Sequence, residues 1–311
     1  MLGLIVLLQA LTLAIAGPPS SPEYLPIWVA AADGHFDRQK LKVTVKPTRS
    51  EVGAAEALAQ SQADLVATSL EAMLRFGARD AQNPRLFFGL TAAPPVALLV
   101  AANNAVTITT VHDLAGLRIG ISAPGAAEHT WLNGILARGG LGANQVNIVS
   151  VGERGLPRAL LGGDVQAAFV HDPVAARLVG ERLATALVDL RTPADAERVL
   201  GGATVSAGVF LRAERRVGEA ELAAFAKALI AAQERIAGGD PEGLAAKLPK
   251  SVVGIPDEFA ARLGQAKYLY LAKGRVTANQ LQASETFLKD QLPLPSRARI
   301  QLLVPPRAAG R

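Results

Sequence analysis

A chain of 311 residues, 50% hydrophobic and 19% charged, can bury one large core or two moderate ones, and this composition excludes a disordered protein. It contains no cysteine, which excludes disulfides, a thiol nucleophile, cysteine-based metal sites and a lipid-modified lipoprotein cysteine. The net charge of +5 comes from scattered lysines and arginines without an aromatic-interleaved basic run, so we expect no nucleic-acid partner.

The first 16 residues form an almost uninterrupted apolar run. The run suits a secretory signal peptide cut after Ala14, Ala16 or Gly17, although no lysine or arginine precedes it. It is short for a membrane span. Its continuous apolar character is also expected of a parallel strand that helices cover on both faces. Composition alone leaves both interpretations open.

Downstream of this run, short apolar segments alternate with helix signals, a pattern typical of α/β proteins. Pro26 in a first turn and Gly34 just past the last turn mark one helix. Asp257 and Thr277 suit the starts of two later helices. In chain order we expect strands at 41–45, 63–68, 86–90, 96–101, 118–121, 146–151, 166–170 and 203–211, and helices at 26–32, 51–60, 127–138, 155–162, 219–237, 241–247, 257–272 and 277–292.

The segment 118–121 is a brief apolar run of strand length, and it is followed by small and helix-breaking residues from Ser122 to Gly125. A helix then begins near Ala126. The peptide N–H groups at such a helix start point into the loop and favour an acceptor or anionic group on a small ligand. This strand, loop and helix are therefore the first candidate for a binding site.

Five segments of the chain carry a family resemblance through their order. They are LPIWVAAADGHFD at 25–37, LKVTV at 41–45, ALAQSQADLVAT at 57–68, DLAG at 113–116 and GDVQAA at 163–168. Together they resemble the periplasmic solute-binding proteins for nitrate, sulfonates, taurine and pyrimidine thiamin precursors, over about residues 11–211. The resemblance implies that residues 11–16 are the first strand, which leaves residues 1–10 as a short or truncated export segment.

The resemblance implies an α/β protein with the two-lobed type II periplasmic-binding-protein fold, in which each lobe is a mainly parallel sheet flanked by helices and two strands form the hinge. Residues 11–103 and 206–311 would form lobe I, and residues 104–205 would form lobe II. The implied function is that of a monomeric periplasmic solute-binding protein. It would capture a small polar organic or anionic ligand between the lobes and deliver it to an ABC permease.

The resemblance also implies which loops line the ligand site. The first wall would contain Ser20, Ser21, Tyr24, Thr68, Ser69 and Thr91, and the second Ser122, Gly125, Ala126, His171 and Asp172. Each position also suits an ordinary turn or helix cap. Tyr24 could stack on a ligand or pack on the start of its helix. Asp172 followed by Pro173 matches the acidic residue and proline that are frequent in the family at this point.

The sequence predicts no catalytic residues, no metal site and no cofactor. It has no GxSxG, GxxxxGK[ST] or GxGxxG motif, and its four histidines show no HExxH spacing. The alternative function is an enzyme or a ligand-sensing protein on the same fold, acting on a pyrimidine-like metabolite. The predicted loops contain no arginine or lysine, while Glu128 and Asp172 could accept hydrogen bonds from an amine, so the charge of the ligand stays open.

Overall fold

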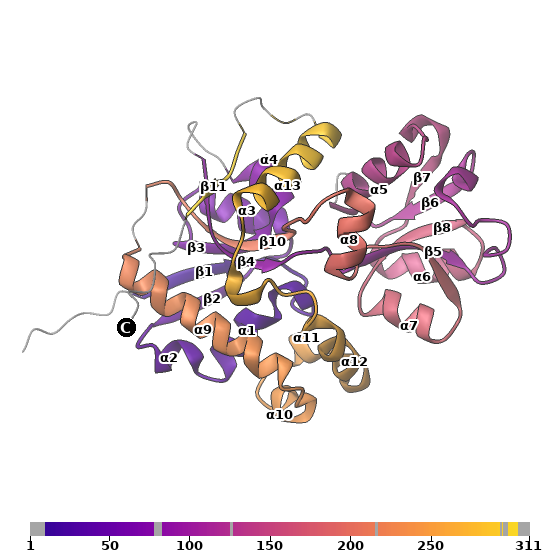
Figure 1. Ribbon diagram of the computed structural model, residues 1–311. Helices are drawn as coiled ribbons and strands as arrows, with labels where there is room; N and C mark the ends of the chain where they lie inside the picture. The colour runs from indigo at the N-terminus through magenta and orange to yellow at the C-terminus, as the bar shows by residue number, and fades with distance from the viewer. Residues whose placement is uncertain are drawn as a thin grey trace, which may run out of the picture. The chain divides into compact units, whose positions relative to one another are not determined.

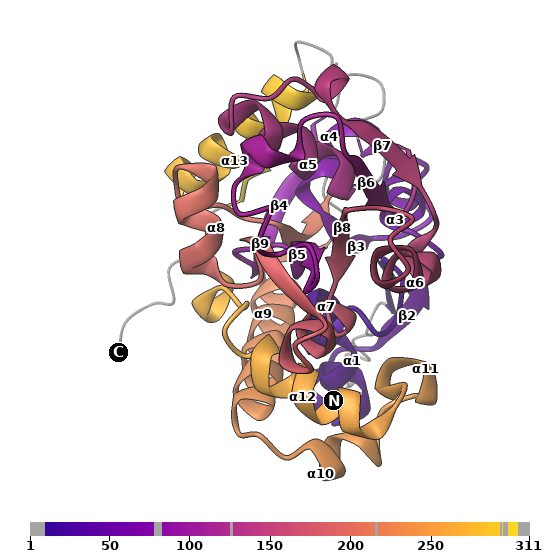
Figure 2. The ribbon, with the colours of Figure 1, turned by 90° about the vertical axis from the view of Figure 1, so that its right-hand side faces the viewer.

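The computed structural model describes residues 10–77, 83–124, 127–214, 217–292, 294 and 298–303 of the chain (Figures 1 and 2). The strands are β1 (Leu11–Ile15), β2 (Val43–Pro47), β3 (Leu65–Ser69), β4 (Arg85–Thr91), β5 (Val96–Ala101), β6 (Arg118–Ile121), β7 (Asn147–Ser150), β8 (Ala167–His171), β9 (Ala184–Asp189), β10 (Ala207–Leu211) and β11 (Gln301–Leu302). The helices are α1 (Leu25–Ala32), α2 (His35–Arg38), α3 (Glu51–Ala59), α4 (Leu70–Phe76), α5 (Ala127–Arg138), α6 (Leu156–Leu161), α7 (Val174–Gly180), α8 (Pro193–Leu200), α9 (Glu219–Ala237), α10 (Pro241–Ala245), α11 (Lys250–Val253), α12 (Pro256–Ala266) and α13 (Ala278–Gln291). None of these described helices is long and apolar enough to cross a membrane.

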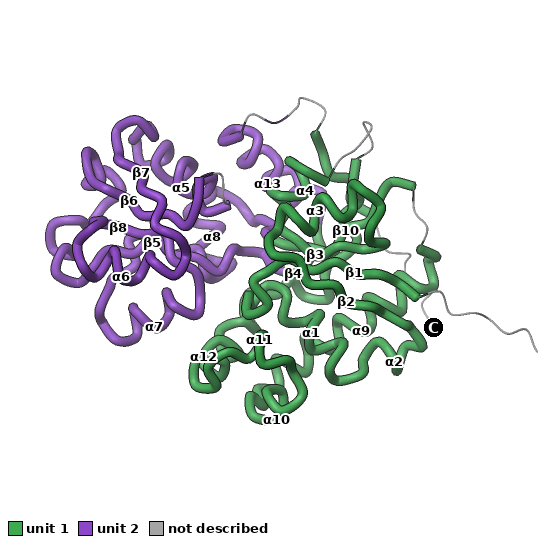
Figure 3. Tube along the Cα trace, turned by 180° about the vertical axis from the view of Figure 1, so that it is seen from behind, with its two compact units in different colours: residues 1–90, 207–276, 296–311 green, residues 91–206, 277–295 purple. Residues whose placement is uncertain are grey.

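The chain forms two compact units, each with its own sheet (Figure 3). Unit 1 consists of residues 1–90, 207–276 and 296–311, and unit 2 consists of residues 91–206 and 277–295. Helices pack against the sheet in both units. The expected α/β architecture with two helix-flanked sheets is therefore confirmed.

The sheet of unit 1 has the strand order β11-β4-β10-β3-β1-β2. β1 lies in its interior and pairs in parallel with β2 and β3, with Leu13 opposite both Val45 and Leu65. Leu13 and Ile15 are fully buried. The first strand expected at residues 11–16 is therefore confirmed, because a strand covered on both faces needs apolar side chains at successive positions.

The sheet of unit 2 has the strand order β7-β6-β8-β5-β9. β6 runs parallel to β7 and β8, whereas β5 runs antiparallel to β8 and β9. It follows that β6, β7, β8 and β9 all point the same way. Their last residues, Ile121, Ser150, His171 and Asp189, define what we call the carboxyl end of unit 2.

Two segments that the sequence assigns to lobe I belong to unit 2. β5 belongs there because it pairs with both β8 and β9, so unit 2 includes the chain from Thr91 onward. Residues 277–295 belong there because α13 packs on α5, where the rings of Trp131 and Phe287 stack with centroids 5.0 Å apart. Both segments are assigned to unit 2 by their contacts with parts of the chain that are distant in sequence.

Some element boundaries also differ from the expected ones. The helix expected at 257–272 ends at Ala266, because Leu271 N–H donates to the Leu90 carbonyl at 3.0 Å and the chain must leave the helix to do so. The expected elements do not include α7, α8 or β9. α8 has a readable signal, since Thr192 caps it and Pro193 stands in its first turn.

Candidate functional site

Open α/β sheets bind ligands beyond the carboxyl ends of their parallel strands, because loops and helix N-termini meet there. In unit 2, β6, β8 and β9 end at Ile121, His171 and Asp189. Polar side chains gather just beyond these strand ends in two groups. One group is centred on Glu128 and the other on Arg191.

Glu128 lies in the first turn of α5 and is almost completely buried. Its Oε1 accepts hydrogen bonds from the Ser122 backbone N–H at 3.0 Å and from the Ser122 hydroxyl. Its Oε2 lies 3.6 Å from Nε2 of His171, the last residue of β8. One carboxylate thus joins the ends of β6 and β8.

Burial by itself raises the pKa of the Glu128 carboxyl, because removal from water disfavours the charged form. Contact with His171 and the hydrogen bond from Ser122 favour the carboxylate more strongly and lower the pKa from 4.5 to about 2. The helix N-terminus acts in the same direction. Glu128 is therefore ionised at neutral pH.

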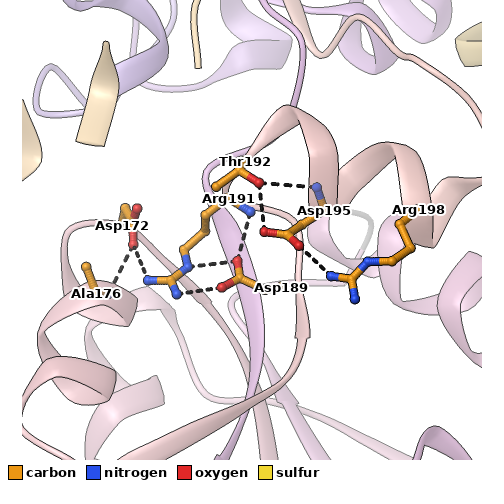
Figure 4. A network of polar contacts seen from close by, with 7 residues as sticks. All are labelled: Asp172, Ala176, Asp189, Arg191, Thr192, Asp195 and Arg198. Carbon is orange, nitrogen blue, oxygen red and sulfur yellow. Dashed lines mark hydrogen bonds and ion pairs between the residues drawn. The ribbon is translucent and has the colours of Figure 1, made fainter. Parts of the chain in front are cut away.

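The second group is an ion-pair network around Arg191, which follows β9 (Figure 4). Its Nε and Nη2 donate to the two oxygens of Asp189 at 2.9 and 2.6 Å, the fork geometry of a strong guanidinium–carboxylate pair. Its Nη1 lies 3.5 Å from Oδ1 of Asp172, which also accepts the Ala176 N–H at 3.1 Å. Arg191 is thus held more firmly by Asp189 than by Asp172.

The two carboxyl groups that contact Arg191 respond differently. Burial raises the pKa of Asp172, and the Arg191 guanidinium and the Ala176 N–H offset only part of this effect. Burial also opposes ionisation of Asp189, but its closer bonds with Arg191 outweigh burial and lower its pKa. The structure places Arg191 beside Asp172. The sequence analysis found no arginine or lysine in the predicted loops because it did not include the loop after β9 among them.

In unit 1, three residues predicted for the site gather around Glu51, the first residue of α3. The Tyr24 hydroxyl donates to Glu51 Oε1 at 3.0 Å, and the Ser69 hydroxyl donates to Oε2 at 2.7 Å. The Thr68 hydroxyl donates to the Glu51 carbonyl oxygen at 2.9 Å. Ser69 also caps α4, since its hydroxyl oxygen accepts the Ala72 N–H at 3.2 Å.

Tyr24 is a fully buried part of the unit 1 core, so it packs at the start of α1 rather than offering its ring for stacking. Burial raises its pKa well above the usual value, and the nearby Glu51 carboxylate adds to the rise. The phenol is therefore protonated and donates its hydrogen bond at any physiological pH.

The remaining predicted residues lie apart from these groups. Ser20 and Ser21 are half-buried in the loop after β1, where the Ser21 N–H donates to the Pro18 carbonyl at 2.9 Å. Thr91 is buried at the end of β4, and its carbonyl accepts the Ser206 N–H at 2.9 Å. Gly125 and Ala126 lie outside the described residues.

Both units share one feature that the sequence did not reveal. In each unit a glutamate in the first turn of a helix, Glu51 or Glu128, accepts hydrogen bonds from side-chain hydroxyl groups. These are hydroxyl groups of residues that were predicted to contact the ligand. The available signal was position, because helix N-termini favour acidic residues directly after a loop. Arg191 had a weaker signal, since it directly precedes the cap of α8.

Ser122, Glu128 and His171 do not have the arrangement of a catalytic triad. In a catalytic triad the serine hydroxyl donates to the imidazole, which removes its proton. Here the Ser122 hydroxyl donates to the Glu128 carboxylate, so it is not activated in that way. Within the described residues, no group of three or more histidine, aspartate or glutamate side chains could hold a metal ion.

The chain belongs to the NMT1/THI5 like family, whose model matches residues 21–202. The matched part contains the whole carboxyl end of unit 2 and the Glu51 group of unit 1. A comparison with curated proteins finds no match.

Solved structures share the fold of this chain. A protein from Bordetella bronchiseptica RB50 is 24% identical, with a TM-score of 0.76 and 94% of each chain covered. The periplasmic aliphatic sulphonate binding protein SsuA from Escherichia coli is 18% identical, with a TM-score of 0.72 over 93% of this chain and 95% of that one. The alkanesulfonate-binding protein SsuA from Xanthomonas axonopodis pv. citri, bound to MOPS, is 19% identical, with a TM-score of 0.67 over 94% and 98%.

Proposed function

We propose that the protein is a periplasmic solute-binding protein that captures a small polar organic or anionic ligand and delivers it to the permease of an ABC transporter. It acts as a monomer. The observation that carries the proposal is the polar cluster at the carboxyl end of unit 2. It belongs to a chain whose fold matches a periplasmic sulphonate binding protein over 93% of its length.

The cluster suits binding because its polar groups are held in place without a ligand. Asp189 holds the Arg191 guanidinium through two hydrogen bonds, and Ser122 holds the Glu128 carboxylate through two more. Groups that are already ordered lose little conformational entropy when a ligand binds, so more of each contact remains as affinity.

An enzyme or a ligand-sensing protein would use the same fold differently. An enzyme acting on a pyrimidine-like metabolite would release a changed molecule, whereas a transport protein releases the molecule it bound. A sensor would bind and release its ligand unchanged but would not stimulate a permease.

The test begins with thermal-shift screening of alkanesulfonates, nitrate, aromatic acids and aminopyrimidines. A ligand at one hundred times its Kd should stabilise the protein by about 2.7 kcal/mol. We expect mass spectrometry to recover that ligand unchanged from the denatured complex. A converted product would establish the enzyme, and a panel without any binder would contradict the proposed ligand class.

Delivery is tested with an ABC permease from the same organism, reconstituted in liposomes. We expect the ligand-loaded protein to stimulate its ATPase activity, with ligand alone as the control. Binding without stimulation would favour the sensor. Light scattering after size-exclusion chromatography tests the monomer.

A further inference from the structure

The ionisable side chains at the carboxyl end of unit 2 differ in how far they reach solvent. Glu128 and Asp172 are 4% and 5% exposed, and Arg191 is 14% exposed. Asp189 is 27% exposed and His171 is 34% exposed. Among these five groups, a ligand arriving from solvent therefore meets the His171 ring first.

The His171 ring stands against a carboxylate that cannot easily turn away. Ser122 holds Glu128 Oε1 through its N–H and its hydroxyl, which leaves Oε2 directed at His171 Nε2. A neutral imidazole facing a carboxylate keeps its single proton on the facing nitrogen, since the other tautomer would oppose two lone pairs. The second proton, when it binds, then goes to Nδ1.

We propose that Glu128 is a positioning residue for His171: it fixes the proton on Nε2 and stabilises the imidazolium, so that unit 2 presents a cationic N–H donor to an acidic group of the ligand. The ligand-binding part of this inference rests on the proposed function. The effect of Glu128 on the His171 ring does not rest on the proposed function, because the two side chains are in contact in the protein without a ligand.

Charges of both signs lie around His171, and the Glu128 carboxylate is in contact with the ring, where it favours the imidazolium. Glu128 remains ionised throughout the physiological range because its pKa is about 2. Asp172 directly follows His171 in the chain, and Asp189 ends β9. Both carboxyl groups contact the one guanidinium of Arg191. On β5, Val96 lies opposite His171 and carries no charge. The other ionisable side chains on helices α5, α6 and α7 near β8 are His129, Arg138, Arg158 and Arg177.

The first experiment follows the His171 imidazole by ¹⁵N NMR as the pH is varied. The chain has four histidines, so a His171→Gln variant assigns the resonance. We expect the neutral ring to carry its proton on Nε2. We also expect the titration midpoint to fall by about one pH unit in Glu128→Gln, because an opposite charge within 4–6 Å shifts a titration by roughly that much or more.

Glu181→Gln is the matched control, because it removes an exposed carboxylate from the same unit. It should leave the His171 midpoint unchanged. Equal midpoints in wild type and Glu128→Gln would overturn the proposal. The wild-type spectrum decides independently of whether the variant folds, since a neutral ring protonated on Nδ1 would also overturn it.

The second experiment measures the affinity for ethanesulfonate and for benzoate by calorimetry between about pH 6 and about pH 8. Losing one charged hydrogen bond costs about a factor of ten, so we expect Kd to rise roughly tenfold across this range. His171→Gln should bind weakly with little pH dependence. If Kd in His171→Gln depended on pH as it does in wild type, or if neither acid bound to wild type, His171 would not be the contact for an acidic group of the ligand. The NMR result would still stand in that case, so the two failures are distinguishable.

Discussion

At the scale of single residues, Asp172 links the start of α7 to Arg191 within unit 2. Its Oδ1 accepts the Ala176 N–H from the first turn of α7 and also contacts Arg191. The side chain is 5% exposed, so water cannot easily replace either partner. The more exposed His171, one position earlier, is better placed to contact a ligand.

We expect Asp172→Ala to lower the free energy of unfolding by about 1–2 kcal/mol, because the Ala176 N–H and the Arg191 guanidinium both lose an acceptor. Asp172→Asn keeps one acceptor oxygen and should therefore cost less than Asp172→Ala. Urea unfolding of the two variants beside wild type measures both effects. Equal stability of Asp172→Ala and wild type would show that these contacts contribute nothing.

The same variants have a defined pH dependence. Because the folded-state pKa of Asp172 is raised, ionising the group costs stability. This cost is absent below the unfolded-state pKa and fully present above the folded-state pKa. Asp172→Asn escapes it, so its stability relative to wild type should improve as the pH rises from about 3 to about 7. A relative loss over that range would mean that Arg191 outweighs burial.

At the scale of elements, α13 shows how a late segment completes an earlier unit. Ser284 on α13 accepts the buried Val205 N–H at 2.9 Å, and Phe287 stacks on Trp131. The Phe287 ring also requires a glycine opposite it, since a Cβ at Gly134 would lie 2.4 Å from a ring atom. One polar and one apolar contact therefore fix α13 on unit 2.

We expect Ser284→Ala to destabilise the protein by about 1–3 kcal/mol, because it leaves the buried Val205 N–H without its acceptor. Thr286→Ala is the matched control, since Thr286 is exposed on the same helix. The control should change stability by about 0.5 kcal/mol or less. Urea unfolding compares the two, and similar values for both variants would argue against the Val205 hydrogen bond as a stabilising contact.

How much the sequence predicts depends on the range of the interaction. β3, β5 and β6 are predictable because strands buried on both faces require local apolar runs. β1 was predicted from the family resemblance, because its apolar run also suits a signal peptide. The contact between Glu128 and His171 cannot be predicted from the sequence, because no local pattern shows which side chain of another element will lie beside a given residue. The same limit explains why Thr68 and Ser69 were predicted while Glu51, which accepts their hydrogen bonds, was not.

At the scale of the whole molecule, β1 tests the interpretation of the N-terminal apolar run. β1 pairs with a neighbour on each side, so deletion of residues 1–16 removes an interior strand of the unit 1 sheet. We expect the truncated protein to be insoluble or to lose its cooperative melting transition. Deletion of residues 1–9 is the control and should leave the melting temperature unchanged. If the 1–16 deletion melts like the full chain, the strand is dispensable and the plain signal-peptide interpretation is correct.

The sheet of unit 1 places β10 between β4 and β3, and β11 on the other side of β4. Unit 2 in turn needs α13 to cover Trp131. The unit 1 core contains residues from Leu11 to Leu263, so a ribosome must complete most of the polypeptide before that core can close, whereas the core cluster of unit 2 lies within residues 97–184. Until then β1, β2 and β3 lack the later segments, β10 and α9 among them, that complete their sheet and core.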